Sequence, residues 1–248
     1  LLSEKIDISI VIVNYNVKDF LNGCLKSIED ASHNLSVETI VVDNNSVDGS
    51  VEYLRPLFPK VEFIALQDNL GFAKANNIGI EKSRGKYVLI LNPDTLLRHD
   101  TLEVMHEYME NDTDCGIAGC KVLNPDGSFQ VACRRGFPTP WAAFSKLFGL
   151  QALFPKSKLF SAYNQLYRSV DETYPIDAVI GAFMFCRRDI LVEVGGFDTE
   201  FFMYGEDLDL CRQVSLRGKK VMYVHKTSII HYKGESTKRS SINDVKHF

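Results

Sequence analysis

Short apolar runs alternate with amphipathic stretches over the first 110 residues of the chain. Runs of strand length predict β-strands over residues 8–13, 39–42, 61–66 and 87–91. The stretches that follow them predict helices over residues 19–28, 50–57, 72–83 and 101–109. Strands that alternate with helices form a mostly parallel sheet covered by helices on both faces. The alternation therefore predicts an α/β fold that binds its ligand at the carboxyl ends of the strands.

Polar residues follow each of these four strands. The side chains that would meet at this edge of the sheet are Asn14, Asp43, Asn45, Asn69, Asn92 and Asp94. Any one of them could belong to a turn, because Asn and Asp are common turn residues. Their repetition at four strand ends favours a binding site.

The second half of the chain is less regular. Its patterns predict strands over residues 116–123, 178–187, 221–224 and 228–231, and helices over residues 191–195 and 207–216. The sequence Asn-Pro-Asp-Gly indicates a turn at residues 124–127, and Gly218 would end the last helix. The basic, serine-rich end, residues 233–248, is expected to be flexible.

Charge and composition exclude several classes of protein. The net charge of -4 and the isoelectric point of about 5.9 give no basic footprint, so we expect no nucleic-acid partner. The six cysteines form no Cys-x-x-Cys pair, which indicates buried free thiols in a reducing compartment. No apolar run reaches the ~18 residues of a membrane span, and no signal region precedes the first strand. We expect a cytoplasmic protein that could work at the inner face of the membrane, although an anchor could lie outside this sequence.

Two acidic clusters could carry chemistry. Asp94 follows a predicted strand, where a carboxylate can hold a divalent cation beside a diphosphate, but a simple proline turn is the alternative. Glu206 and Asp207 open a predicted helix, where carboxylates oppose the helix dipole. In a partly desolvated cleft one of them could instead act as a general base. His231, at a strand end, is either structural or a ligand at the same site.

A series of short motifs runs through nearly the whole chain. In order, they are Val-Ile-Val-Asn-Tyr-Asn at 11–16, Val-Val-Asp-Asn-Asn-Ser at 41–46, Asp-Gly-Ser at 48–50, Asn-Leu-Gly-Phe-Ala-Lys-Ala-Asn at 69–76 with Asn77 and Gly79, Leu-Ile-Leu-Asn-Pro-Asp at 89–94, Gly-Ala-Phe-Met at 181–184, Gly-Gly-Phe-Asp at 195–198, the segment 201–212, and His-Tyr-Lys-Gly-Glu-Ser at 231–236. Together they resemble the inverting, GT-A-type glycosyltransferases of family 2. Within that family they are similar to the bacterial rhamnosyltransferase-like branch.

This resemblance implies a GT-A fold over residues 1–248, a single Rossmann-like domain that binds nucleotide-diphospho-sugars. Residues 1–110 would form the nucleotide-sugar half, residues 111–240 the acceptor-binding and catalytic half, and residues 241–248 a flexible tail. It also implies that one group of polar side chains binds the nucleotide-sugar: Asn14, Asp43, Asn45, Asn69, Asn76 and Asn92. Among them, Asp43 would contact the base or ribose.

The resemblance gives the acidic clusters separate roles. Asp94 would bind Mg²⁺ or Mn²⁺ together with the diphosphate, and His231 would complete the metal shell. Asn92 stands where the family's Asp-x-Asp element has its first carboxylate, which leaves the metal fewer charged ligands. Asp207 matches the catalytic base, with Glu206 beside it.

The implied reaction moves a hexose or deoxyhexose from a nucleotide diphosphate to an acceptor hydroxyl, with inversion by a single displacement. The best match is rhamnose from dTDP-rhamnose, and the acceptor would be a saccharide or a lipid-linked saccharide in bacterial polysaccharide or cell-surface glycan synthesis. A non-catalytic nucleotide-sugar sensor on the same fold is the alternative. The sequence after the first strand lacks the glycine pattern of dinucleotide-binding oxidoreductases and of P-loop enzymes.

Two further features lie in the second half. Arg134 and Arg135 could hold a phosphate of the donor or acceptor, or could form a solvated surface pair. Apolar residues from Trp141 to Phe154 recur at helical spacing, with lysines nearby. They predict an acceptor lid, a contact with lipid-linked substrate at a membrane surface, or an ordinary core or dimer-interface helix.

Overall fold

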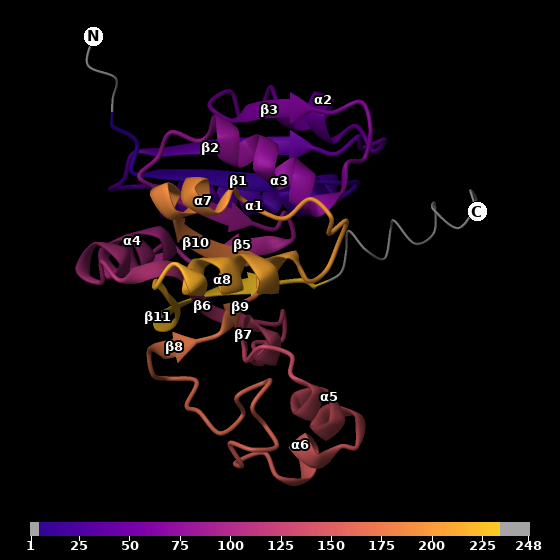
Figure 1. The fold of residues 1–248 in the computed structure, drawn as a ribbon. Helices are drawn as coiled ribbons and strands as arrows, with labels where there is room; N and C mark the ends of the chain where they lie inside the picture. The colour runs from indigo at the N-terminus through magenta and orange to yellow at the C-terminus, as the bar shows by residue number, and fades with distance from the viewer. Residues whose placement is uncertain (1–4, 234–248) are drawn as a thin grey trace.

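The computed structural model describes residues 5–233, and its main sheet has nine strands (Figure 1). The order across the sheet is β3 (Glu62–Ala65), β2 (Val37–Asp43), β1 (Ile8–Asn14), β4 (Tyr87–Leu91), β10 (Phe183–Arg187), β6 (Cys115–Leu123), β11 (Lys220–His231) and β5 (Thr95–Leu97), with β8 (Tyr174–Ile176) paired to β11. The first four strands are parallel, and so are β6 and β11. The antiparallel members are β10, β5 and β8. The α/β fold with a mostly parallel sheet is confirmed.

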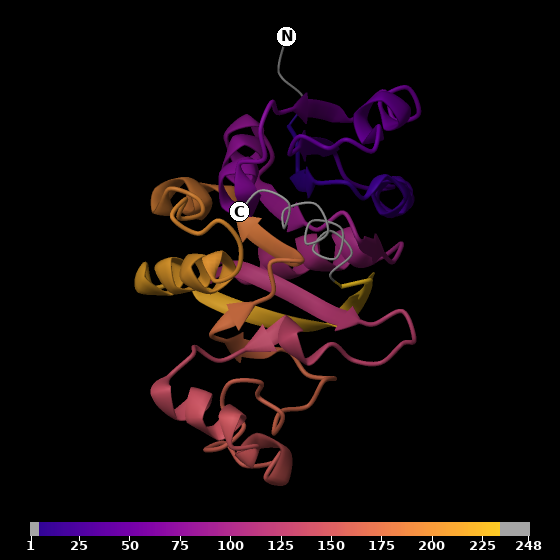
Figure 2. The ribbon, with the colours of Figure 1, turned by 90° about the vertical axis from the view of Figure 1, so that its right-hand side faces the viewer.

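Helices cover both faces of this sheet (Figure 2). The face with α1 (Lys18–Ala31) also carries α2 (Ser50–Leu54) and α4 (Thr101–Asn111), and the other carries α3 (Gly71–Lys82), α7 (Arg188–Val194) and α8 (Glu206–Leu216). Because the central strands are covered on both sides, every residue of β1 and β4 is buried. All the predicted helices of the first half exist, with bounds within a few residues.

The structure differs from the sequence-based expectation at several strands, among them β8, which was not predicted. Residues 178–187 form two strands, β9 (Ala178–Val179) and β10, because the chain turns at residues 180–182. The two strands expected over 221–224 and 228–231 are one strand, β11, with an irregularity between them. The three-residue β5 was not predicted at all.

Helix α3 packs very closely on β1, and Gly79 permits this. A Cβ atom at Gly79 would overlap with Cγ1 of buried Val11. We therefore expect Gly79→Ala to lower the free energy of unfolding by about 1–3 kcal/mol, measured by denaturant titration. Gly23→Ala is the matched control, since that Cβ would make an ordinary 3.4 Å contact and alanine favours the helix. Equal stability of both variants would contradict the close packing.

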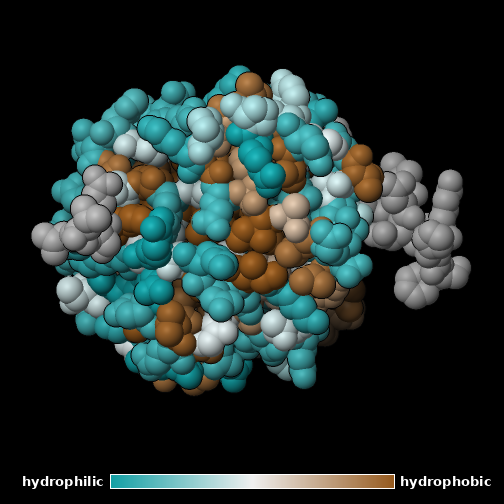
Figure 3. Space-filling model, turned by 90° about the horizontal axis from the view of Figure 1, so that it is seen from above, coloured by the Kyte–Doolittle hydropathy of each residue, from teal (hydrophilic) through white to brown (hydrophobic). Residues whose placement is uncertain are grey.

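A long insertion separates β6 from the last part of the sheet. It contains the 3₁₀ turn Val131–Cys133, β7 (Arg134–Arg135), α5 (Pro140–Leu147) and α6 (Leu150–Leu153), and β7 pairs with β9 in a second, two-stranded sheet. Helices α5 and α6 project from the end of the molecule opposite β3 (Figure 1). The β3 end, seen from above, presents hydrophobic groups in the middle of a largely hydrophilic surface (Figure 3).

Other expectations can be compared with the described residues. All six cysteines are buried free thiols, as predicted. Between residues 5 and 233 no helix combines the length and apolarity that crossing a membrane requires. The expected tail, residues 241–248, and the end of the last motif, residues 234–236, lie outside the described part of the chain.

Candidate active site

The carboxyl ends of β1 and β2 are joined by a hydrogen-bond network. Asn14 lies beside Asp43 in the parallel register, and its Nδ2 donates to Asp43 Oδ1 at 2.7 Å and to Ser46 Oγ at 3.1 Å. The backbone N–H of Ser46 donates to the second carboxylate oxygen of Asp43. This fixes Asp43 in one orientation at the strand end, where the sequence predicted a nucleotide contact.

The other predicted nucleotide residues differ in their surroundings. Asn69 Oδ1 accepts from Asn44 Nδ2 at 2.7 Å and from the N–H of Gly71, so it shapes the turn into α3. Asn76 is fully buried in α3, and its Oδ1 has no partner. Asn45 is exposed, with a positive φ of 65°. Their roles toward a ligand remain predictions.

Asp94 and His231 are brought together by strand β5, which the sequence did not predict. Strand β5 pairs antiparallel with the end of β11, with Thr95 opposite His231. The backbone N–H of Tyr232 also donates to the carbonyl oxygen of Asp94. This pairing places His231 Nε2 3.3 Å from Asp94 Oδ1, and both side chains are more than 95% buried.

Gln130 fixes the orientation of the His231 ring. Its Nε2 donates to the carbonyl oxygen of His231 at 2.7 Å, so its Oε1 is the atom that lies 3.0 Å from Nδ1. An amide oxygen can only accept, so Nδ1 carries a proton and Nε2 is the ring nitrogen that faces Asp94. Gln130 escaped the sequence analysis because a lone glutamine after a turn carries no pattern.

The pair of Asp94 and His231 fits a divalent cation. Asp94 Oδ1 and, in the neutral ring, His231 Nε2 are buried acceptor atoms that converge, and among residues 5–233 neither has a hydrogen-bond partner. Two acceptors this close require a positive charge between them or a proton. Across residues 5–233, no group of three or more His, Cys, Asp or Glu side chains could hold a metal ion. The protein would therefore supply two ligands, and a bound diphosphate or water the others.

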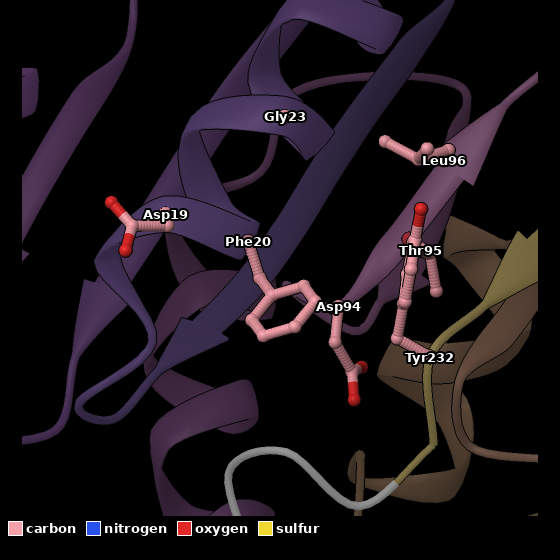
Figure 4. Close-up of a pocket in the computed structure, with 7 residues that line it drawn as sticks. All are labelled: Asp19, Phe20, Gly23, Asp94, Thr95, Leu96 and Tyr232. Carbon is pink, nitrogen blue, oxygen red and sulfur yellow. The ribbon is translucent and has the colours of Figure 1, made fainter. Parts of the chain in front are cut away.

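A pocket of about 280 Å³ lies beside Asp94 on the α1 side of the site (Figure 4). Phe20 from α1 and Tyr232 after β11 form its apolar walls, with their ring centroids 5.2 Å apart. Asp94 lines the same pocket, and its carboxylate points past the edges of these two rings (Figure 4). The Asp94 side chain therefore lies beside an apolar wall and is only 3% exposed.

Asp207 begins helix α8, and three donors hold its carboxylate. Oδ2 accepts from Arg135 Nη2 at 2.6 Å and from the N–H of Gly181 at 2.9 Å. Within the described residues, Oδ1 accepts only the N–H of Leu208. Since a carboxylate offers about four lone-pair positions, one position on Oδ1 is available to a substrate hydroxyl. Of the two arginines considered from sequence, Arg135 therefore lies at this predicted base.

One turn links the two acidic clusters. The turn at residues 180–182 donates to Asp207 from Gly181 and accepts the N–H of Asn92 at the carbonyl oxygen of Ala182. A short run of backbone thus connects Asp207 with the strand end that carries Asp94. These three segments are far apart in sequence, and the sheet brings them to one edge.

Glu206 differs from its neighbour. Its side chain is buried and Oε2 has no hydrogen-bond partner. Burial raises the pKa of the Glu206 carboxyl above its usual value, and the adjacent Asp207 raises it further, while a backbone hydrogen bond and Arg135 oppose the shift. Two neighbouring carboxylates with different surroundings can occupy different protonation states.

Arg134 lies away from this edge. Its guanidinium donates to the carbonyl oxygens of Ser169 and Arg168 and to the hydroxyl of Tyr174. It also lies over the ring of Phe129, 5.0 Å from the centroid. These contacts fasten the insertion to the sheet, and a phosphate contact by Arg134 remains only a prediction.

The fold and this site can be compared with known proteins. A model of the family described as Glycosyl transferase family 2 matches residues 9–195. The chain belongs to glycosyl transferase family 2. It is a glycosyltransferase, and the resemblance found in its motifs is confirmed.

Two relatives share the rhamnosyltransferase-like character of this glycosyltransferase. The N-acetylglucosaminyl-diphospho-decaprenol L-rhamnosyltransferase of Mycobacterium tuberculosis is 26% identical over 241 residues, which cover 93% of this chain and 77% of the relative. The rhamnosyltransferase WbbL of Escherichia coli is 28% identical over 233 residues, covering 90% and 82%.

Solved structures agree on the GT-A fold. The mannosyltransferase PcManGT of Pyrobaculum calidifontis, in complex with GDP-Man and Mn²⁺, superposes with a TM-score of 0.66 at 17% identity, covering 93% of this chain and 58% of that one. TarS of S. aureus superposes with a TM-score of 0.64 at 16% identity, covering 94% and 62%. This glycosyltransferase thus spans less than two thirds of the length of each of these two solved chains. At 16–17% identity, the two solved structures show the fold alone.

Proposed function

We propose that this glycosyltransferase moves a hexose or deoxyhexose, with rhamnose from dTDP-rhamnose as the leading donor, onto an acceptor hydroxyl with inversion. The observation that carries the proposal is the single edge at which Asp207, held by Arg135, is joined through one turn to the Asp94 and His231 pair. Such a displacement needs two groups: a base that accepts the proton of the attacking hydroxyl, and a group that stabilises the leaving diphosphate.

Asp207 acts as the general base in this proposal. Its Oδ1 takes the proton of the acceptor hydroxyl while that oxygen attacks the anomeric carbon opposite the departing diphosphate. Arg135 and the N–H of Gly181 hold Oδ2, so the carboxylate keeps one orientation during the transfer. Asp43, fixed by Asn14 and Ser46, contacts the base or ribose of the nucleotide.

Asp94 and His231 would hold Mg²⁺ or Mn²⁺, which would supply positive charge to stabilise the leaving diphosphate. Asn92 takes the place of a second carboxylate in this part of the site. The Mn²⁺ in the structure of PcManGT supports a divalent ion of this kind.

The acceptor in this proposal is a saccharide carried on a lipid diphosphate. The mycobacterial relative is named for such an acceptor, an N-acetylglucosaminyl-diphospho-decaprenol. The reaction would then belong to bacterial polysaccharide or cell-surface glycan synthesis on the cytoplasmic side of the membrane.

A donor panel tests this function. The protein is mixed with each nucleotide-sugar, a lipid-linked acceptor and Mn²⁺ or Mg²⁺, and release of nucleoside diphosphate is followed. We expect release to be fastest with dTDP-rhamnose and to stop when the metal is chelated. Tight donor binding without release from any donor would instead indicate a non-catalytic nucleotide-sugar sensor.

Gln130 provides a separate test of the metal site. Gln130→Ala removes the acceptor for the Nδ1 proton, so His231 loses its fixed ring orientation and tautomer. We expect about 10–100-fold weaker Mn²⁺ binding in the presence of nucleoside diphosphate, measured by calorimetry. The ¹⁵N shifts of the His231 ring should also change from the Nδ1–H tautomer to a mixture. Exposed Gln67→Ala is the control, and unchanged ring shifts would contradict the role of Gln130.

A further inference from the structure

The segment 127–170 has an unusual charge composition for this chain. It contains six of the 28 basic residues and none of the 32 acidic ones, although the whole chain has a net charge of -4. It also contains α5 and α6, which project from the end of the molecule opposite β3 (Figure 1). A positively charged extension on an acidic protein favours an anionic partner.

The same segment exposes large apolar side chains. We call these residues the α5–α6 surface: Trp141, Phe144, Leu147, Phe148, Leu153, Phe154 and Leu159. Three of their aromatic members form a continuous series, with ring centroids 5.4 Å apart for Trp141 and Phe144 and 4.5 Å apart for Phe144 and Phe148. A core helix would bury these side chains, so the core interpretation of residues 141–154 is wrong.

Apolar residues at the other end of the molecule lie in a different setting. Val47, Tyr53 and Leu57 are exposed on or beside α2, but Asp48 and Glu52 stand among them in sequence. Acidic and apolar residues are mixed there, whereas no acidic residue interrupts the α5–α6 surface. The β3 end of the molecule therefore lacks the combination that would attract an anionic surface.

Two lysines flank the α5–α6 surface. Lys156 and Lys158 are exposed, and in the described part of the chain neither makes an ion pair or a hydrogen bond. A second copy of this chain docked on the same surface would bring lysine against lysine. An anionic bilayer instead attracts lysine at its headgroups and receives aromatic and leucine side chains at the acyl boundary.

We infer that the α5–α6 surface docks on a lipid bilayer that carries anionic headgroups. The position of the segment gives the docking a consequence for the site. The segment contains β7, where Arg135 pairs with Asp207, so the bilayer lies on the side of the proposed catalytic base. A lipid-linked acceptor would approach from there. The docking itself rests on exposure and charge and does not depend on the proposed transfer.

Vesicle co-sedimentation tests the apolar part of this surface. Vesicles of equal parts phosphatidylglycerol and phosphatidylcholine should sediment the full chain, and vesicles of phosphatidylcholine alone should do so about tenfold less. Leu147→Ser with Phe148→Ser, 81% and 61% exposed, should weaken binding at least about tenfold. Leu216→Ser with Val192→Ser, 69% and 60% exposed on α8 and α7, is the matched control and should leave binding unchanged.

A charge-reversal pair tests the electrostatic part. Lys156→Glu with Lys158→Glu should weaken binding to the anionic vesicles by about tenfold or more. Lys26→Glu with Lys60→Glu gives the same net charge at exposed sites elsewhere and should have little effect.

Three results would overturn the inference. They are no sedimentation of the wild-type chain, equal losses in the test and control pairs, and light scattering that shows a dimer broken by Leu147→Ser with Phe148→Ser. The last result would assign the surface to a second copy. Circular dichroism checks that each variant is folded. Because binding is measured without turnover, a failed docking test leaves the proposed transfer reaction unaffected.

Discussion

Asp207→Asn is expected to slow sugar transfer by about 100- to 10,000-fold while donor binding stays unchanged. The amide cannot take the proton of the acceptor hydroxyl at the position that Oδ1 offers. It can still accept hydrogen bonds from Arg135 and from the N–H of Gly181 through its oxygen, so the turn at residues 180–182 should keep its shape. The loss should therefore appear in kcat and not in the Kd for nucleoside diphosphate.

Single-turnover transfer and calorimetric nucleotide binding measure the two quantities separately. Asp209→Asn is the matched control, because it makes the same chemical change on the same helix at a partly exposed carboxylate that faces Gln213. We expect nearly full activity in that control. An Asp207→Asn enzyme with wild-type kcat would remove Asp207 as the base and direct attention to Glu206.

Asp94→Asn is expected to reduce kcat/KM by about 100- to 1,000-fold and to remove the metal dependence of nucleoside diphosphate binding. The substitution keeps the size of the side chain but takes away the one carboxylate beside His231 Nε2. With Asn92 already in place of an acid, the site would then hold no carboxylate at the end of β4.

Titration of nucleoside diphosphate with and without Mn²⁺ checks this expectation. Exposed Asp114→Asn, at a carboxylate paired with Lys220, serves as the control and should keep the metal dependence. If Asp94→Asn retained wild-type enhancement of binding by Mn²⁺, the pair of Asp94 and His231 would not be the metal site.

The strands that end at the site could be predicted because consecutive residues in each strand carry the apolar pattern. Every residue of β1 and β4 is buried, and the runs 10–13 and 87–91 within them are continuously apolar. The polar residues that follow, such as Asn14 and Asp94, interrupt those runs abruptly. Parallel pairing then brings these strand ends to one edge, as expected from the alternation of strands and helices.

Other parts of the site carried no local pattern. Strand β5 has three residues, which is too short for a periodicity, yet its pairing with β11 places His231 on Asp94. The turn at residues 180–182 interrupts a run that is apolar throughout and therefore looked like one strand. Gln130 contacts His231, which lies 101 positions further along the chain, and Arg135 contacts Asp207, which lies 72 positions further along. Such long-range contacts leave no pattern in the local sequence.

The sequence by itself determined the α/β fold, the polar strand ends, the family and the two acidic clusters. These features follow from apolar periodicity and from short motifs, and both are defined by residues that are close together in the sequence. The tertiary structure alone decided that His231 faces Asp94, that Gln130 orients its ring, that Arg135 holds Asp207, and that the α5–α6 surface stays uncovered. Each of these contacts depends on which distant segments pack together. The spacing of residues along the sequence does not show which segments these are.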